Sequence, residues 1–242
     1  MAKLGAYDHI ISLGHSCRLS HNLRRTFGIT RAQPFDWWMT PLAALAAFLK
    51  DPSIERLYAP ELLRPAPPPG GEGVMTIENV HYDIQLFHDF PREPKSLSVV
   101  DDWREHLPAA RDRTRYLLDR MLGLPQGERI LFVRHIRRKE LAERSDHFLP
   151  LADEIQVILH GLFPRHEFDL LFIDPPADVQ SGNVFSLQIR DPANKPWDGT
   201  PALWSEKLLG AGIRWTGRPA GQDLAPDTAH GPVGESAAET SD

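Results

Sequence analysis

The chain contains a single cysteine, Cys17, among its 242 residues. One thiol excludes a disulfide within the chain, and it excludes zinc or iron–sulfur sites built from several cysteines. No segment is apolar for long enough to span a bilayer, and the first residues lack the apolar stretch of a secretory signal peptide. We therefore expect a cytoplasmic protein in a reducing environment, with no membrane partner.

The sequence also lacks the signatures of nucleotide and nucleic-acid binding. The formal net charge is −6, which argues against a general nucleic-acid partner. Neither a Gly-x-Gly-x-x-Gly motif nor a Walker-type loop occurs. We expect no cofactor and no metal ion, and the sequence does not indicate an oligomeric state.

Hydrophobic residues make up 41% of the chain, enough for a sizeable core. Helices are predicted where apolar residues recur at helical spacing, over 17–27, 41–49, 107–121 and 151–162. Strands are predicted at short apolar runs, over 10–13, 130–133, 168–173 and 184–189. This alternation predicts an α/β fold, with a three-layer, open and mostly parallel sheet covered by helices on both faces.

Two segments differ from the rest in composition. Residues 64–73 are rich in Pro and Gly and are predicted to form a loop, whereas residues 80–90 alternate and predict an edge strand or a hairpin. Residues 217–242 have few apolar anchors and are predicted to be disordered. We therefore expect one α/β domain over residues 1–216.

Ligands of open parallel sheets bind beyond the carboxyl ends of the strands. Four segments are expected there: Gly14–Cys17, Arg134–Arg138, Asp174 and Arg190–Asp191. This rule places the cysteine among charged residues, not deep in the core.

Cys17 lies where the first predicted strand gives way to a helix. Free N–H groups and the positive end of the helix dipole favour a thiolate, which is the nucleophilic form of cysteine. The alternative is a small buried core residue. The backbone N–H groups around Ser16–Arg18 could form an oxyanion hole, with Gly14 and His15 in the same turn.

A cysteine nucleophile needs a base, commonly histidine, and a group that orients the base. His88 is our candidate base, and its alternative is a hydrogen-bonded core residue. Asp36 is the candidate orienting group, and its alternative is an acceptor for backbone N–H groups of its loop. Asp89 is a second candidate, although adjacent side chains of a strand diverge.

Basic residues at the same edge of the sheet predict a different function, which is ligand binding. Arg134, Arg137, Arg138 and Arg190 could bind a carboxylate, a phosphate or a sugar, or could form a solvated basic loop. Ser16 is either the helix N-cap or, in a serine hydrolase, the nucleophile.

Three motifs resemble those of a known bacterial family. Ile11, Leu13, Gly14 and Cys17, then Pro34-Phe35-Asp36-Trp37, then Phe87-His88-Asp89-Phe90 occur in the order found in a family of unknown function labelled papain-like cysteine peptidases. The resemblance covers about residues 8–215. It implies that Cys17 is the nucleophile and His88 the base, with Asp36 or Asp89 as the third member.

A second resemblance involves Ser16. The segment from Ile11 to Ser16 is similar to the Gly-Asp-Ser block of SGNH hydrolases, but His15 replaces the aspartate and no Asp-x-x-His motif lies near the carboxyl end.

The sequence therefore predicts a cysteine hydrolase, a peptidase or a related acyl-transfer enzyme, acting on a peptide or another small substrate. A binding module for an anionic small molecule or sugar, and an SGNH-like serine esterase, are the alternatives.

Overall fold

The computed structural model describes residues 4–15, 17–68, 73–136, 148–179, 181–191 and 197–217. The predicted disordered tail lies outside these residues, apart from Gly217. So do residues 69–72 of the predicted Pro/Gly-rich loop.

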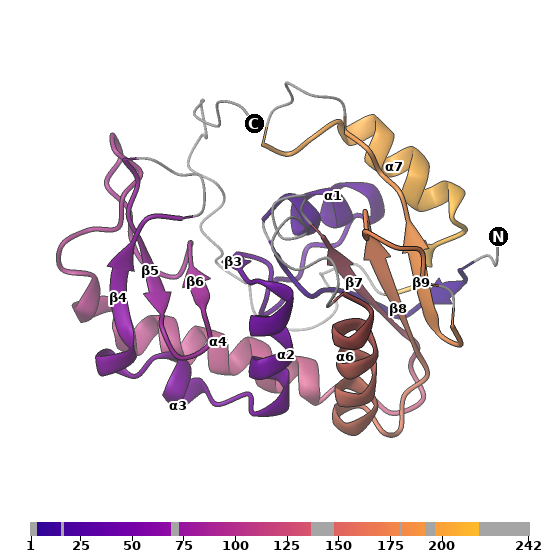
Figure 1. Cartoon of the computed structure of the whole chain (residues 1–242), viewed down its shortest axis with the longest axis horizontal. Coiled ribbons are helices and arrows are strands. Elements are labelled where there is room, and N and C mark those ends of the chain that lie inside the picture. Colours follow the sequence, from indigo (N-terminus) through magenta and orange to yellow (C-terminus); the bar gives the residue numbers. More distant parts are fainter. Residues whose placement is uncertain are drawn as a thin grey trace.

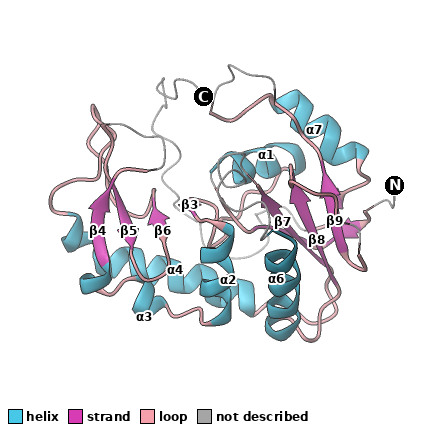
Figure 2. Ribbon diagram, viewed as in Figure 1, coloured by secondary structure: helices cyan, strands magenta, loops and turns pink. Residues whose placement is uncertain are grey.

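A four-stranded parallel sheet forms one part of the fold (Figures 1 and 2). Its strands lie in the order β2 (His9–Ser12), β7 (Ile130–His135), β8 (Phe168–Ile173) and β9 (Val184–Leu187). Beside it, β1 (Ala6–Tyr7) pairs in parallel with β10 (Arg214–Trp215). The predicted strands are confirmed, with small changes at their ends.

Both faces of this sheet are buried, and alternate residues belong to two hydrophobic clusters. The first cluster joins Ile11 and Phe132 to the helices α2 (Leu42–Lys50), α4 (Leu107–Leu122) and α6 (Phe148–Leu162). The second joins Leu131 and Val133 to α1 (Cys17–Phe27) and α7 (Pro201–Gly210). In Figure 1, α1 and α7 lie above the sheet and α2 and α6 below it. Burial on both faces explains why these strands are continuous apolar runs.

The helix ends follow the local sequence. The chain leaves α1 through Gly28 at φ +69°, which glycine adopts without a steric penalty. Pro41 directly precedes α2, where its missing N–H has no consequence. A short 3-10 helix, Trp103–His106, precedes α4, which begins at Leu107 as the helical spacing predicts.

The structure contains a second, antiparallel sheet, of which the sequence predicts only an edge strand or a hairpin over residues 80–90. Its strands lie in the order β3 (Trp38–Met39), β6 (Ile84–Leu86), β5 (Thr76–Asn79) and β4 (Leu63–Ala66). The short helix α3 (Ile54–Leu57) and a 3-10 helix at Pro60–Leu62 lead into β4.

Strand β4 corrects the loop prediction for residues 64–66. Pro65 fits there because β4 is an edge strand, where an N–H on the open side needs no partner. Strand β6 ends at Leu86, so the alternation predicted through Phe90 does not continue and His88 lies in the turn that follows. Within the described part of the chain, every helix is too short or too polar to cross a membrane.

Candidate active site

The turn between β2 and α1 is strained and closely packed. Gly14 has φ +75°, and a Cβ there would lie 3.0 Å from the carbonyl oxygen of Phe35. His15 follows at φ +87°, a conformation that costs a non-glycine residue on the order of 1–3 kcal/mol. The hydroxyl of Ser12 accepts hydrogen bonds from Gly14 N (3.1 Å) and from Ser20 Oγ (3.1 Å). The start of α1 is therefore held in one position relative to the sheet.

Cys17 is the first residue of α1 and is half-buried. The first turn of the helix contains no acidic residue, and Arg18 follows the cysteine directly. Arg18 Nε donates to the carbonyl oxygen of Trp197 at 2.5 Å. The thiol therefore lies in the first turn of a helix that has no acidic residue there and a basic residue beside the cysteine.

His88 lies against aromatic rings in the turn after β6. Its ring centroid is 5.4 Å from that of Trp37 and 4.8 Å from that of Phe87. Burial lowers the pKa of His88 to about 4, and Arg92 and Arg113 lower it further in the same direction. Its Nε2 is buried and has no hydrogen-bond partner among the described residues. The imidazole is neutral at pH 7, but the charges around it disfavour its protonated form.

The carboxylate of Asp36 contacts other groups than His88. Its Oδ2 accepts from Arg24 Nη2 and from Gln33 N, each at 2.8 Å. Burial raises the pKa of Asp36, and Arg24 opposes that shift. The cavity beside it has a volume of about 10 Å³, room for one water molecule at most. Asp36 thus accepts a backbone N–H of its own loop and also forms a partly buried ion pair with Arg24 of α1.

Asp89 links the antiparallel sheet to the helices around it. Its Oδ2 accepts from Trp38 Nε1 at 2.9 Å and from the Tyr58 hydroxyl at 2.8 Å. Its Oδ1 is 3.0 Å from Arg113 Nη2. Burial raises the pKa of Tyr58, and the neighbouring Asp89 adds to the shift. Both carboxylate oxygens of Asp89 are therefore engaged by donors other than His88.

Arg134 does not lie on an open rim, which corrects the sequence-based prediction. It is completely buried in β7, and its guanidinium donates to the carbonyl oxygens of Leu13 (3.1 Å) and Thr40 (2.5 Å). A guanidinium can be buried here because backbone carbonyls at the strand ends supply acceptors. Arg190 is exposed. Ser16, Arg137 and Arg138 lie outside the described residues.

The carboxyl edge of the parallel sheet contains a further pair, His135 and Asp174. His135 is the last residue of β7 and is 6% exposed, and its Nε2 is 3.7 Å from Asp174 Oδ2. Asp174 follows β8 at φ +53°, and its Oδ1 accepts from Ile189 N at 2.5 Å. Burial lowers the pKa of His135, Asp174 opposes the shift, and Arg18 and Arg134 add to it.

Sequence reasoning placed Asp174 at this edge but did not select His135. The signal was present in the alternation of β7, which puts His135 on the same face as Leu131 and Val133, opposite Arg134. Those two residues belong to the cluster that packs against α1 and α7.

The ring of His135 packs against Trp204, which is itself held by a hydrogen bond. Its centroid is 5.3 Å from that of Trp204, and Trp204 Nε1 donates to Asp191 Oδ2 at 2.8 Å. Asp191 Oδ1 also accepts from Thr200 N, the residue before α7. A Cβ at Gly199 would lie 2.3 Å from Asp191 Oδ2, so glycine is needed for this approach.

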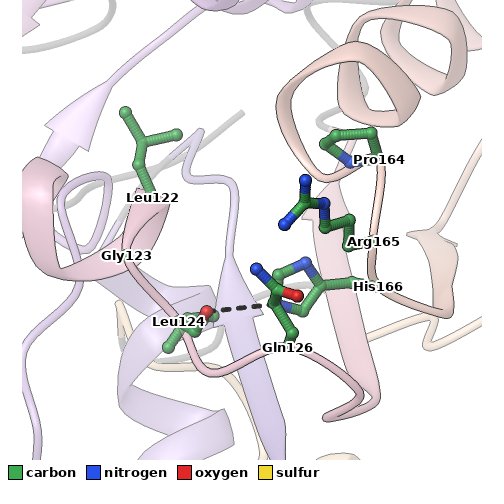
Figure 3. A pocket seen from close by; sticks show the side chains of 7 residues that line it. All are labelled: Leu122, Gly123, Leu124, Gln126, Pro164, Arg165 and His166. Carbon is green, nitrogen blue, oxygen red and sulfur yellow. Dashed lines mark hydrogen bonds between the residues drawn. The ribbon is translucent and has the colours of Figure 1, made fainter.

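A larger pocket, about 490 Å³, lies at the opposite edge of the sheet (Figure 3). Leu124 and Gln126 precede β7, and Pro164 and His166 precede β8, so the pocket is at the amino ends of these strands. The imidazole of His166 is engaged by the carbonyl oxygens of Leu124 (3.2 Å) and Pro125 (3.0 Å). The pocket, at the amino ends of the strands, is therefore remote from Cys17, which follows the carboxyl end of β2. Among the described residues, no group of three His, Cys, Asp or Glu side chains is arranged to hold a metal ion.

Comparison with protein-family models, with curated proteins and with solved structures found no match to this chain. We therefore base the function on the geometry of these residues.

Proposed function

We propose that the protein is a thiol-dependent hydrolase or acyl-transfer enzyme with Cys17 as its nucleophile. The observation that carries the proposal is the position of Cys17 in the first turn of α1, directly after a strained turn at the carboxyl end of β2. Strain of this kind persists only where the surrounding structure enforces it, and it clusters at functional sites.

The chemistry follows from the thiolate. A histidine takes the proton from the Cys17 thiol, and the sulfur attacks the carbonyl carbon of an amide, ester or thioester. The backbone N–H groups at the start of α1 stabilise the oxyanion that forms. The histidine then returns the proton to the leaving group, and water or an acceptor nucleophile releases the acyl group from sulfur.

Burial lowers the pKa of both His88 and His135, so either of them could accept this proton at neutral pH. The resemblance to the bacterial cysteine-peptidase family supports His88 as the base and a peptide as the substrate. A binding module lined by arginines has less support, because Arg134 is committed to two backbone carbonyls inside the fold.

The finer expectations from the sequence belong to the same proposal. We infer a three-layer arrangement of the parallel sheet, supported by the two hydrophobic clusters on its alternate residues. We also propose that the enzyme acts in the cytoplasm on a peptide or small-molecule substrate.

The test is the pH dependence of alkylation by iodoacetamide, followed by mass spectrometry on the full chain. Because Cys17 is the only thiol, each added carbamidomethyl group reports on that residue. We expect the midpoint of the rate profile to lie at least one pH unit below about 8.5, the value for an ordinary thiol. Thioester and ester probes of varied acyl groups then test turnover, with Cys17→Ala as the control. An unreactive thiol with an ordinary midpoint, and no turnover of any probe, contradicts the proposal.

A further inference from the structure

We propose that His135, oriented by Asp174, is the base that activates Cys17. The inference rests on the proposed function, since it names the partner of the same nucleophile. It assigns the role to a residue on the neighbouring strand of the parallel sheet, in place of His88.

The register of the sheet puts His135 beside the turn that leads to Cys17. Ser12 of β2 pairs with Val133 of β7, and Leu13 N donates to the Val133 carbonyl at 2.8 Å. Continuing this register by two residues puts Gly14, in the turn after β2, opposite His135, the last residue of β7. The imidazole therefore lies at the height of the turn that ends at Cys17.

His135 also lies on the face of the sheet that packs against α1. His135 shares a face with Leu131 and Val133, which pack in one cluster with Leu19 and Leu23 of α1. The imidazole is thus on the α1 side of the sheet. It is also close enough to Arg18, the neighbour of Cys17, for the two charges to interact.

Asp174 supplies an orienting carboxylate to His135, whereas no carboxylate of the described residues is paired with His88. Its Oδ2 faces His135 Nε2 at 3.7 Å, and the hydrogen bond from Ile189 N fixes the other oxygen. Nδ1 of His135 is buried and has no hydrogen-bond partner among the described residues. A carboxylate at one ring nitrogen and a free second nitrogen is the arrangement of a base in a nucleophile–base–acid triad.

The charges around His135 allow it to accept a proton and then release it. Burial disfavours the imidazolium most, Asp174 beyond β8 favours it, and Arg18 on α1 and Arg134 on β7 add smaller unfavourable contributions. The resting imidazole is neutral and can accept the thiol proton at Nδ1. The S–H bond breaks, an N–H bond forms, and the resulting imidazolium lies against the carboxylate.

The experiment compares alkylation profiles of the wild-type chain with those of His135→Gln, His88→Gln and Asp174→Asn. We expect a low midpoint in the wild type. His135→Gln should raise it to about 8.5, with a loss of roughly 10- to 100-fold in rate at pH 7, and Asp174→Asn should give a smaller loss of rate at pH 7. His88→Gln should leave the profile unchanged.

The other outcomes separate the two proposals. A low midpoint that rises only in His88→Gln, or in neither histidine variant, overturns the role of His135 and leaves Cys17 as the nucleophile. An ordinary midpoint in the wild type overturns the proposed function itself, together with this inference.

A second experiment uses the wild-type chain, so it tests the inference even if His135→Gln does not fold. The histidine ring signals of the 15N-labelled wild type are followed by NMR before and after Cys17 is alkylated. We expect the titration of His135 to change and that of His88 to stay the same. The reverse pattern contradicts the inference.

Discussion

Two histidines, one beside each sheet, show how the surroundings of a side chain determine its chemistry. His135, at the edge of the parallel sheet, faces the carboxylate of Asp174. His88, after the antiparallel sheet, faces the guanidinium groups of Arg92 and Arg113 and the ring of Trp37. Burial lowers the pKa of both, but only His135 has a group that stabilises its protonated form. A base that must hold a proton during catalysis therefore fits the parallel-sheet edge better.

The largest expected effect is the loss of the nucleophile at the parallel-sheet edge. Cys17→Ala should reduce turnover of a thioester probe by about 10³-fold or more, because the covalent route is removed. Circular dichroism and thermal unfolding should remain close to wild type, since the residue is half-buried and small. Turnover that persists in Cys17→Ala would move the active site away from this edge.

A second prediction compares two carboxylates, Asp36 and Asp174. Asp36→Asn should lower the free energy of unfolding by about 2–3 kcal/mol, because it leaves Arg24 partly buried without its counter-charge. Urea unfolding measures this loss, and Arg24→Met with the double variant completes the cycle. The alkylation rate at pH 7 should not change; a loss of rate as large as that in Asp174→Asn would make Asp36 the orienting group.

The third prediction concerns the stability contributed by a neutral His88. The pKa of His88 is lowered from 6.5 to about 4, so acid protonates this histidine first in the unfolded chain. Stability is retained above pH 6.5 and falls as the pH drops toward 4, by about 3 kcal/mol in total. Between pH 7 and pH 4.5, we expect the free energy of unfolding of His88→Gln to fall by about 2–3 kcal/mol less than that of the wild type. Urea unfolding at the two pH values measures this difference. Equal losses in both proteins would show that His88 is solvated.

Asp174→Asn should have a smaller effect, and on activity more than on stability. We expect roughly a tenfold lower kcat for a thioester probe, because the imidazolium of His135 loses its counter-charge. Because Asp174 raises the pKa of His135, the acidic limb of kcat/KM that reports this histidine should move to lower pH in the variant. A variant that loses stability without a change in the pH profile would make Asp174 a structural residue.

The smallest expected effect is that of Arg190→Ala. Arg190 is exposed, so we expect stability within about 0.5 kcal/mol of wild type and turnover of a neutral thioester within twofold. Probes with a carboxylate in the acyl group provide the matched comparison. A selective rise in KM for the acidic probe would support an anion-binding site at this edge.

Local patterns predicted most of the first sheet and its helices. The apolar runs of β7 and β8, and the helical spacing of α1 and α6, are determined by burial on two faces or on one stripe, and both leave a periodic trace in the sequence. The strand-to-helix junction at Cys17 is local in the same way. The antiparallel sheet was largely missed because its strands are two to four residues long and because β3 pairs with β6, which is distant in sequence.

The sequence by itself determined the α/β class, the parallel strands and the position of the only thiol at the start of a helix. The tertiary structure decided which charges surround each candidate residue. His88 and His135 both follow apolar runs, so no local pattern distinguishes them. The carboxylate that faces His135 comes from another strand, and Asp36 is engaged by Arg24 on α1. Electrostatic interactions act through space and have no period along the chain, which is why only the fold reveals them.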